Sequence, residues 1–352
     1  MRVIIAAGGT GGHLFPAIRL AEEILLKGSE PFILTSSRMQ DSNILENKNI
    51  KFFTLPIKNL RSKGIISVLD FLFYLTLGTI RSAILLFRIK PSYVVGFGGY
   101  VSGPVLLLAC LFRIKTMIHE QNVYPGKTNK ILARFVGRVA ISFPETRKHL
   151  KCSQKKIIFS GNILRKEILL LKDLEKKEDI FKVLIMGGSQ GSSALNRFLP
   201  EAIGLMGEEK KRSLELVHIS GAKDRESVAK NYKEKGIKSR VLSFTEAIDK
   251  LYNECDFVVA RAGATTISEL MHLGKPAILV PYPYGDRHQI HNAKVLEKIG
   301  SGVIIEEKSI TTRKLVDILT GFMDRGRLND MSKKAGIVSN DASRILVEEI
   351  LR

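Results

Sequence analysis

The chain has 352 residues, of which 45% are hydrophobic, and a formal net charge of +20. This length is too great for one ordinary hydrophobic core and fits two domains. The three cysteines, Cys110, Cys152 and Cys255, are far apart and form no Cys-x-x-Cys pair, which argues against a disulfide framework or a zinc ribbon and favours a reducing cytoplasm.

The positive charge is concentrated in the first half of the chain. Residues 1–160 contain 23 Lys and Arg against 8 Asp and Glu, whereas residues 161–352 contain 32 against 27. An anionic substrate, an anionic membrane surface or a nucleic acid would each suit such an excess. The sequence has no RNP-like aromatic motif, zinc finger or basic recognition helix, so we expect no nucleic-acid partner.

Short apolar runs typical of buried strands alternate with helical patterns along the whole chain. In the first half the predicted strands are Val3–Ala7, Pro31–Thr35, Lys51–Leu55, Tyr93–Gly96, Thr116–His119 and Val139–Ser142. In the second half they are Lys182–Met186, Glu215–Ser220, Ser239–Leu242, Phe257–Ala260, Ala277–Val280 and Val303–Glu306. This alternation predicts an α/β protein in which each half forms its own Rossmann-like, doubly wound parallel sheet.

The segment Lys166–Lys182 is rich in Lys, Glu and Asp and poor in strand signals, which places the domain boundary near residues 160–180. We expect a first domain at 1–162 and a second at 163–352, with the last helix, about 338–352, packing back on the first. Ligands of doubly wound sheets bind at the carboxyl ends of the strands. The cleft shared by two such domains is therefore the expected active site.

A glycine-rich loop follows the first strand of each half. Gly8-Gly-Thr-Gly-Gly-His13 precedes a helical stretch from Leu14 to Leu26, and Gly187-Gly-Ser-Gln-Gly-Ser192 precedes one from Ala194 to Met206. Such loops bring backbone amides and the positive end of a helix dipole to a bound anion. They indicate two phosphate-bearing substrates, or one substrate that is held from both sides.

The other phosphate-binding patterns fit poorly. Leu14 stands where G-x-G-x-x-G needs its last glycine, and the second strand ends in Thr35-Ser36-Ser37 without an acid for a ribose diol, so NAD binding is not expected. Gln121 stands where a P-loop ending in Gly126-Lys127-Thr128 needs its first glycine.

Metal ligands are also sparse in the sequence. No Asp-x-Asp pair is present, so a diphosphate would be held by amides and helix dipoles. His288 and His291 have one nearby acid, Asp286, which is too few for a metal site. We expect no metal and no required cofactor, and the sequence leaves dependence on a divalent ion open.

Ile65–Ile89 is a 25-residue apolar segment that carries three charges, at Asp70, Arg81 and Arg88. A transmembrane helix would put the strands before and after it in different compartments, and charges near a bilayer centre cost roughly 2.5 to 3.5 kcal/mol each. The alternatives are a buried helix pair and a helix pair with an exposed apolar face. An exposed apolar face in a basic domain would suit an anionic lipid surface.

Eight motifs in a fixed order carry a specific resemblance that covers essentially the whole chain. They are Gly8-Gly-Thr-Gly-Gly-His13, Gly98-Gly-Tyr-Val-Ser-Gly-Pro104, His119-Glu-Gln-Asn122, Gly126-Lys-Thr-Asn129, Gly161-Asn162 with Arg165, Gly187-Gly-Ser-Gln-Gly191, Arg261-Ala-Gly-Ala-Thr-Thr-Ile-Ser-Glu269 and Asp286-Arg-His-Gln-Ile-His-Asn292. The chain closely resembles the undecaprenyl-diphospho-muramoylpentapeptide β-N-acetylglucosaminyltransferases of bacterial peptidoglycan synthesis, which have a two-domain GT-B fold. The resemblance implies an acceptor-binding, membrane-associating first domain and a second domain that binds the UDP-sugar.

The resemblance also implies roles for individual residues. His13 would be the general base, with Glu120 as its rival, although His13 could instead order the glycine loop. The acceptor diphosphate would contact Gly9, Gly98, Gly99, Tyr100 and Ser102. The UDP-N-acetylglucosamine donor would contact Thr10, Gly11, Gly12, Asn122, Arg165, Ser189, Thr245, Ala264, Thr265, Glu269 and Gln289.

Several of these roles have structural alternatives in the sequence itself. Glu269 would bind the ribose diol, although an acid early in a helix is also favoured by the dipole alone. Thr245 would meet uracil through its backbone. His119, Glu120, Tyr100, Asn129 and Asn196 lie in matching motifs, and each could serve only to order a loop.

By this resemblance the reaction is transfer of N-acetylglucosamine from UDP to the 4-hydroxyl of the muramoyl pentapeptide on a polyprenyl diphosphate, with inversion at the anomeric carbon. The expected place is the cytoplasmic face of the plasma membrane, as a peripheral protein on an anionic surface. The alternatives are a UDP-sugar isomerase or epimerase of similar fold, a transferase for another UDP-sugar and lipid acceptor, and a non-catalytic sensor.

Overall fold

The computed structural model describes residues 1–8, 11–37, 45–46, 48–58, 64–171, 180–188, 191–284, 287–335 and 341–352. The chain divides into two compact units, one of Met1–Arg165 with Asn340–Arg352 and the other of Lys166–Ser339. The sequence places the boundary between residues 162 and 163, whereas the division falls between Arg165 and Lys166.

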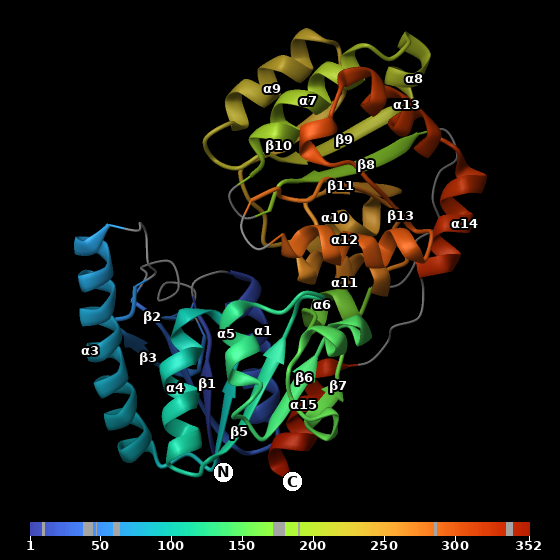
Figure 1. Ribbon diagram of the computed structural model, residues 1–352. Coiled ribbons are helices and arrows are strands. Elements are labelled where there is room, and N and C mark those ends of the chain that lie inside the picture. Colours follow the sequence, from blue (N-terminus) through green and yellow to red (C-terminus); the bar gives the residue numbers. More distant parts are fainter. Residues whose placement is uncertain are drawn as a thin grey trace. The chain divides into compact units, whose positions relative to one another are not determined.

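The first unit contains a parallel sheet with strand order β3-β2-β1-β4-β5-β6-β7 (Figure 1). Its strands are β1 (Arg2–Ala6), β2 (Glu30–Ser36), β3 (Lys51–Leu55), β4 (Tyr93–Gly96), β5 (Lys115–Glu120), β6 (Arg138–Ile141) and β7 (Ile157–Phe159). Its helices are α1 (Gly11–Leu26), α3 (Ile65–Ile89), α4 (Gly99–Leu111), α5 (Lys127–Leu132) and α15 (Ala342–Leu351), with 3₁₀ turns η1 (Pro144–His149) and η2 (Gln154–Lys156). The arrangement is the doubly wound one that the sequence predicts.

Both faces of this sheet are covered, which explains why its central strands are continuous apolar runs. Val3 and Ile5 of β1 pack with α1 and α15 on one face, and Ile4 and Ala6 pack with α3, α4 and α5 on the other. Helix α15 therefore returns from the end of the chain to complete the first unit, where it lies against α1.

Helix α3 is continuous over 25 residues, so the expectation of a helix pair is wrong. Gly78 lies within the helix without interrupting it. A Cβ at Gly78 would lie 2.2 Å from Cγ1 of Ile57, so the missing side chain lets the helix approach the segment after β3. Leu85, Leu86 and Ile89 join the core of the first unit. By length and composition alone α3 would suffice to cross a membrane.

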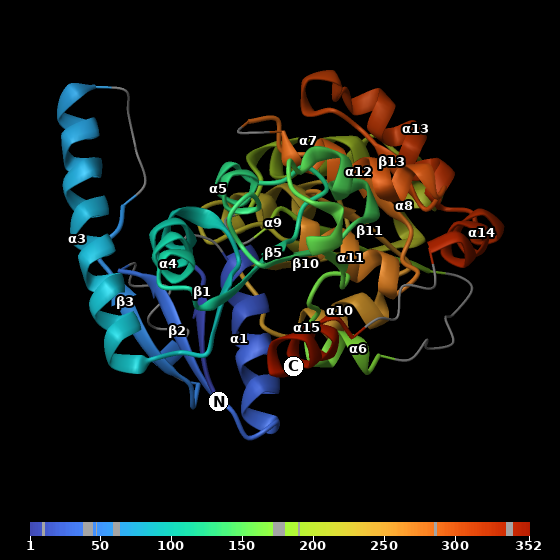
Figure 2. The same ribbon diagram turned by 60° about the horizontal axis from the view of Figure 1, so that its bottom comes forward.

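Most of the length of α3 nevertheless shows an apolar face to solvent. In Figures 1 and 2, α3 lies at the margin of the first unit, beside α4. Its exposed apolar side chains, which we call the α3 face, are Ile65, Ile66, Val68, Leu69, Leu72, Phe73, Leu77, Ile80, Ile84 and Phe87, and Leu107 and Leu111 of α4 are exposed as well. The expectation of an exposed apolar face is therefore confirmed, on a single helix.

The second unit contains a parallel sheet with strand order β10-β9-β8-β11-β12-β13. Its strands are β8 (Phe181–Met186), β9 (Leu214–Ile219), β10 (Ser239–Leu242), β11 (Phe257–Ala260), β12 (Ala277–Leu279) and β13 (Gly302–Ile304). Its helices are α6 (Lys166–Leu169), α7 (Ser193–Gly204), α8 (Glu208–Arg212), α9 (Arg225–Glu234), α10 (Ile248–Glu254), α11 (Ala264–His272), α12 (His288–Lys298), α13 (Thr312–Phe322) and α14 (Arg325–Ala335), with a 3₁₀ turn η3 (Glu307–Ser309).

In both sheets the strand order reverses next to the first strand. In the first unit the chain moves outward from β1 through β2 and β3 and then returns to place β4 on the other side of β1. In the second unit it moves outward from β8 through β9 and β10 and then returns to place β11 on the other side of β8. Ligands of doubly wound sheets bind at such switch points, beyond the carboxyl ends of the strands. The glycine-rich loops predicted from the sequence follow β1 and β4 in the first unit and β8 and β11 in the second.

Candidate active site

In the first unit the predicted residues follow three neighbouring strands. Gly8 follows β1, Gly98 follows β4, and Glu120 ends β5, and the sheet order places β4 between the other two. Carboxyl ends of neighbouring parallel strands lie along one edge of a sheet, so these loops share that edge. Gly9 and Thr10 lie outside the described residues.

His13 is the third residue of α1 and is partly exposed at this edge. Its Nδ1 lies 3.4 Å from the carbonyl oxygen of Gly8. A carbonyl only accepts hydrogen bonds, so in this contact Nδ1 carries the ring proton and Nε2 of the neutral ring keeps its lone pair. Nε2 is then the nitrogen that can take a proton from a substrate hydroxyl.

The loop after β4 closes against this histidine because two glycines permit it. Gly98 and Gly99 have φ angles of 88° and 74°, and a Cβ at Gly99 would lie 3.0 Å from the oxygen of Gly8 and 3.4 Å from Nδ1 of His13. A side chain at Gly99 would therefore press on both groups. The first residues of α4, Gly99 and Tyr100, are partly exposed.

Ser102 has a different role from the predicted contact with a diphosphate. It is fully buried, and its hydroxyl lies 2.7 Å from the oxygen of Gly98 and 2.9 Å from the oxygen of Ala6, within donating distance of both. The side chain thus ties the start of α4 to the end of β1. Its contribution to an anion site is to fix the loop.

Glu120 is a loop-ordering carboxylate rather than an available base. It is 1% exposed, and its Oε1 accepts from the backbone and side-chain nitrogens of Asn122 at 2.8 and 3.2 Å. Its Oε2 accepts from the amide of Gly126 at 3.0 Å and from Nδ2 of Asn129 at 2.8 Å. Four donors on two oxygens fix the turn between β5 and α5.

His119, the residue before Glu120, connects this turn to Gly161, close to the point where the chain leaves the first unit. Its Nε2 is 3.1 Å from the oxygen of Gly161, and its Nδ1 is 3.2 Å from Nε2 of Gln121. Gln121 also donates to the oxygen of Phe97, at 3.2 Å. Complete burial lowers the pKa of His119 to about 4, against a smaller opposing effect of the Gly161 carbonyl, so the ring is neutral at pH 7.

The remaining predicted residues of the first unit lie near the start of α1. Gly11 and Gly12 are the first residues of α1, and Gly12 is exposed. The guanidinium of Arg165 lies over the ring of Phe15, 4.9 Å from its centroid. This contact brings Arg165 to the first turns of the helix that carries His13. The side chain of Asn122 is partly committed, because its Nδ2 bonds to Glu120.

In the second unit the loop after β8 is closely packed. A Cβ at Gly191, whose φ is 79°, would lie 2.0 Å from the oxygen of Ser220, so no side chain fits there. Ser192 caps α7 by accepting from the amide of Leu195 at 3.4 Å. Asn196 donates to the oxygen of Ser220 and to Asp224, and thus orders the loop after β9. Ser189 lies outside the described residues.

The start of α11 is the second place in the structure whose geometry suits an anion. Gly263 precedes it in an extended conformation without a side-chain cap, and Ala264 and Thr265 are the first helical residues. The first amides of a helix have no partner within the helix. Because this helix starts beyond β11, at the switch point of the sheet, its amides are suited to a phosphate group.

Helix α12 holds the loop before α11 in place. Oε1 of Gln289 accepts from the amide of Ala262 at 3.1 Å and from the amide of Tyr282 at 2.9 Å, and Nδ2 of Asn292 donates to the oxygen of Ala262 at 3.2 Å. These contacts leave the amide NH₂ of Gln289 as the group that it can offer to a ligand oxygen. Arg261 pairs with Glu307 at 2.5 Å and donates to the oxygen of Val280.

Glu269, the sixth residue of α11, is 4% exposed. Its Oε2 accepts from the hydroxyl of Tyr252 on α10, at 2.9 Å. The Thr245 side chain accepts from the amide of Ala247 at 3.1 Å and thereby closes the turn before α10. That bond occupies the side chain and is compatible with a ligand contact through the Thr245 backbone.

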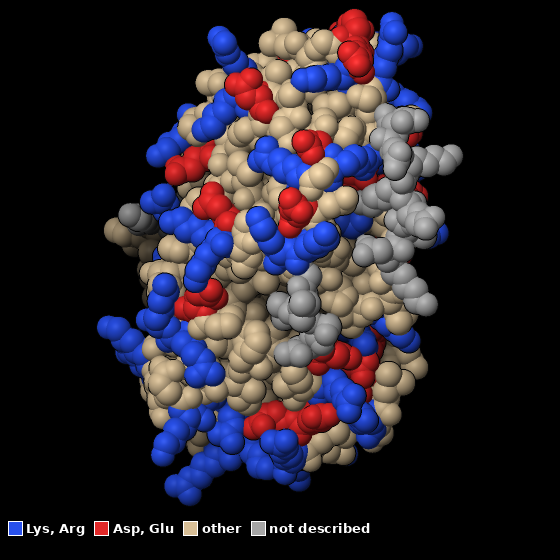
Figure 3. Space-filling view, turned by 90° about the vertical axis from the view of Figure 1, so that its right-hand side faces the viewer, with Lys and Arg blue, Asp and Glu red and all other residues tan. Residues whose placement is uncertain are grey.

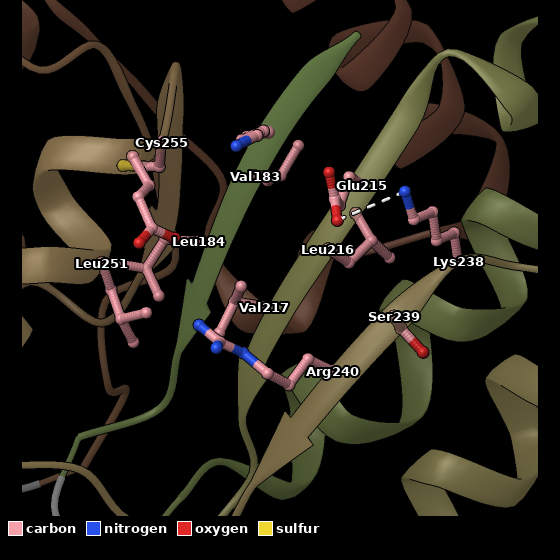
Figure 4. Close-up of a pocket in the computed structure, with 12 residues that line it drawn as sticks. Val183, Leu184, Glu215, Leu216, Val217, Lys238, Ser239, Arg240, Leu251 and Cys255 are labelled. Carbon is pink, nitrogen blue, oxygen red and sulfur yellow. Dashed lines mark ion pairs between the residues drawn. The ribbon is translucent and has the colours of Figure 1, made fainter. Parts of the chain in front are cut away.

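A hollow of about 230 Å³ lies elsewhere on the second sheet (Figure 4). It is lined by the amino-terminal halves of β8 and β9, by Lys238–Arg240 and by the end of α10, and Lys238 pairs with Glu215 across it. Because it lies away from the carboxyl ends of the strands, it holds none of the predicted donor residues. Among the described residues there is no group of three or more His, Cys, Asp or Glu that could hold a metal ion.

Sequence reasoning missed Tyr252, Asn292 and the part played by Gln121. Gln121 and Asn292 lie inside motifs that were singled out, so their place in the sequence was a usable signal. Tyr252 lies in an ordinary amphipathic stretch between two motifs. Nothing in that stretch indicates that its hydroxyl meets Glu269, 17 residues later.

Comparisons with known proteins agree with this geometry along nearly the whole chain. The model of the glycosyltransferase family 28 N-terminal domain matches residues 3–141, and that of the family 28 C-terminal domain matches residues 182–346. The UDP-N-acetylglucosamine--N-acetylmuramyl-(pentapeptide) pyrophosphoryl-undecaprenol N-acetylglucosamine transferase of Syntrophus aciditrophicus (strain SB) is 40% identical over 346 residues, 97% of this chain and 95% of the relative.

The enzyme of the same name from Geobacter metallireducens is 37% identical over 360 residues, 100% of this chain and 98% of the relative. Among solved structures, the crystal structure of MurG from Acinetobacter baumannii is similar, with a TM-score of 0.81 and 31% identity, and the match covers 99% of each chain. The relatives therefore match this chain in length as well as in sequence.

Proposed function

The chain belongs to glycosyltransferase family 28, among the N-acetylglucosamine transferases of undecaprenyl-linked muramyl pentapeptide, and from this membership we infer its reaction. It transfers N-acetylglucosamine from UDP-N-acetylglucosamine to the muramoyl pentapeptide carried on undecaprenyl diphosphate, which gives the lipid-linked disaccharide for peptidoglycan synthesis. The observation that carries this conclusion is the identity of 37 to 40% over nearly the full length of both partners.

We propose that His13 is the general base. Nε2 takes the proton of the 4-hydroxyl of the muramoyl sugar while that oxygen attacks the anomeric carbon of N-acetylglucosamine. The bond from the anomeric carbon to the diphosphate oxygen breaks, UDP leaves with the bonding electrons, and the configuration inverts. The contact between Nδ1 and the Gly8 oxygen supports this assignment because it selects the tautomer that leaves Nε2 unprotonated.

We propose that the donor diphosphate is held by backbone amides without a required cation. The uncapped start of α11 at Ala264 and Thr265 supports this, since its amides can stabilise the negative charge that develops on the leaving UDP. The amide NH₂ of Gln289 meets the transferred sugar, Glu269 the ribose, and the Thr245 backbone the uracil. Gly11, Gly12, Asn122 and Arg165 in the first unit, and Thr10 and Ser189 outside the described residues, are the other proposed donor contacts.

For the acceptor, we propose that the diphosphate binds to the loops after β1 and β4, at residues 8–12 and 96–103. The positive φ angles of Gly98 and Gly99 support this, because they turn this loop toward the Gly8 carbonyl and the first turn of α1. In this proposal Gly9, Gly98, Gly99 and Tyr100 contact the phosphate oxygens, and Ser102 keeps the loop in place from behind.

We propose that the protein rests on the cytoplasmic surface of the plasma membrane through the α3 face. A contiguous apolar surface on one helix suits insertion at a lipid interface. Arg81, Arg88 and Lys90 on or next to α3, with Arg113 and Lys115 after α4, are exposed and supply positive charge for an anionic surface. Away from this face, in the view of Figure 3, Lys and Arg side chains are interspersed with Asp and Glu side chains.

A transfer assay tests the reaction directly. UDP-N-acetylglucosamine labelled in the sugar is incubated with the purified protein, with and without the lipid-diphosphate-linked muramoyl pentapeptide. We expect label in the lipid fraction only when the acceptor is present, and less label from UDP-glucose or UDP-galactose. Conversion of the nucleotide sugar to an epimer without acceptor would favour the isomerase alternative.

A further inference from the structure

A buried hydrogen bond between two helices of the second unit is not explained by the roles assigned so far. Tyr252, on α10, is fully buried, and its hydroxyl donates to Oε2 of Glu269 on α11 at 2.9 Å. Both side chains are almost entirely buried, so water competes little for this bond. A hydrogen bond to a carboxylate in such a place is stronger than one between neutral groups.

The bond restricts how Glu269 can be used. A glutamate side chain has three rotatable bonds and samples many rotamers when it is unrestrained. With Oε2 held by a hydroxyl from the neighbouring helix, the plane and direction of the carboxylate are fixed before a ligand arrives. Preorganisation of this kind raises affinity because less side-chain freedom is lost on binding.

The same short helix is also attached to the turn proposed to meet uracil. The Thr245 hydroxyl accepts from the amide of Ala247, and α10 begins at Ile248, so Tyr252 is the fifth residue of the helix. Helix α10 therefore joins the turn at one end to the Glu269 carboxylate through a side chain one turn later. The two parts of a nucleoside site would then keep a fixed spacing.

We propose that Tyr252 is a positioning residue for recognition of the donor's ribose, acting through Glu269. This inference rests on the proposed function, which supplies the contact between Glu269 and the ribose hydroxyls. The Tyr252 hydroxyl sets the orientation of the carboxylate and thereby the selectivity for a ribonucleotide donor. It takes no part in the proton transfer at the sugar.

The experiment compares UDP-N-acetylglucosamine with its 2′-deoxyuridine analogue as donors for wild type, Tyr252→Phe and Glu269→Gln. Because the ribose 2′-hydroxyl would bond to the ionised carboxylate of Glu269, we expect wild type to prefer the ribonucleotide donor by about 10- to 100-fold in kcat/KM. For Tyr252→Phe we expect KM for UDP-N-acetylglucosamine to rise about fivefold, with KM for the deoxy donor within about twofold of wild type and kcat little changed. The preference therefore falls.

Tyr232→Phe is the matched control. Tyr232 is fully buried in the same unit, and its hydroxyl bonds to Nδ1 of His218 at 2.9 Å, so the control also removes a buried hydroxyl. We expect it to leave the preference between donors at the wild-type value. Thermal unfolding of both variants shows whether they fold equally well.

Each other outcome overturns a specific statement. If Tyr252→Phe raises KM for both donors equally, or changes the preference no more than Tyr232→Phe does, the positioning role is wrong. If Glu269→Gln keeps the wild-type preference while Tyr252→Phe reduces it, Tyr252 acts without Glu269 and the proposal also fails. If wild type transfers no sugar from either donor, the failure lies in the proposed function, before the inference is reached.

Discussion

At the scale of single residues, burial and hydrogen bonding separate the two candidate bases. The sequence offers His13 and Glu120, each next to a glycine-containing loop. The structure gives Glu120 four donors and leaves it 1% exposed, whereas His13 is partly exposed, with a carbonyl near Nδ1. A base must reach a substrate proton, so the structure favours His13.

The first prediction concerns these two side chains. His13→Gln removes the imidazole that accepts the proton and should lower kcat by about 10²- to 10⁴-fold, with a smaller effect on KM for the donor. Steady-state kinetics with saturating lipid acceptor measure both values.

Glu120→Gln is the contrasting variant. It places an NH₂ group against backbone and side-chain donors, so it should lower the free energy of unfolding by about 1 to 3 kcal/mol. While the protein remains folded, kcat should fall far less than in His13→Gln. A loss in Glu120→Gln as large as that in His13→Gln, in a protein that is still folded, would restore Glu120 as the base.

The sequence identified residues whose role follows from a motif and missed those whose role follows from tertiary contact. His13, Glu269 and Gln289 lie in recognisable motifs, and the structure places all three beside loops at the carboxyl ends of strands. Ser102 is predicted as a diphosphate contact and Glu120 as a rival base because a motif cannot tell a buried side chain from an exposed one. Tyr252 has no local pattern, and only the packing of α10 against α11 shows its partner.

At the scale of secondary structure elements, the strands were predictable both in the centre and at the edges of the sheets. Lys51–Leu55, Tyr93–Gly96, Ser239–Leu242 and Phe257–Ala260 have the predicted limits, and the limits of the other predicted strands differ by one or two residues at an end. β7 (Ile157–Phe159), at the edge of the sheet directly after Lys155 and Lys156, is not among the predicted strands. Its length does not explain this, because β12 and β13 also have three residues and were predicted.

The second prediction concerns the α3 face. Phe73→Ser with Phe87→Ser replaces two exposed aromatic rings and should reduce sedimentation with vesicles that contain anionic lipid, while unfolding by urea changes little. High salt should reduce wild-type binding as well, because the exposed Arg and Lys side chains contribute.

Leu205→Ser is the control for this experiment, since Leu205 is an exposed apolar residue of the second unit. It should bind vesicles as wild type does. Wild-type binding that depends on neither anionic lipid nor salt would contradict the electrostatic part of the proposal, and equal binding by the double variant would contradict the part assigned to α3.

At the scale of the whole molecule, each unit contains a buried neutral histidine. Burial lowers the pKa of His119 in the first unit to about 4 and that of His218 in the second unit to about 3, from an ordinary value near 6.5. The unfolded chain therefore binds protons below pH 6.5 that the folded chain does not bind until the pH is much lower. Stability should rise with pH across this window and fall as the pH is lowered.

The third prediction follows from these two groups. Between pH 7 and pH 4, His119 alone should cost the first unit about 3 kcal/mol of unfolding free energy, and His218 should cost the second unit a similar amount. Urea unfolding followed by circular dichroism at several pH values measures the loss. His218→Gln should show a smaller loss on acidification than wild type, and an unfolding free energy that does not change between pH 6.5 and 4 would contradict the burial argument.

The central claim is that backbone amides at the start of α11 and the Glu269 carboxylate hold the nucleotide of the donor without a bound cation. The most direct measurement is a crystal structure with UDP-N-acetylglucosamine, grown in the presence of a chelator. We predict ribose hydroxyls at Glu269, diphosphate oxygens at the amides of Ala264 and Thr265, and no metal ion between them. A nucleotide bound away from α11, or one that binds only through a metal ion, would contradict the account.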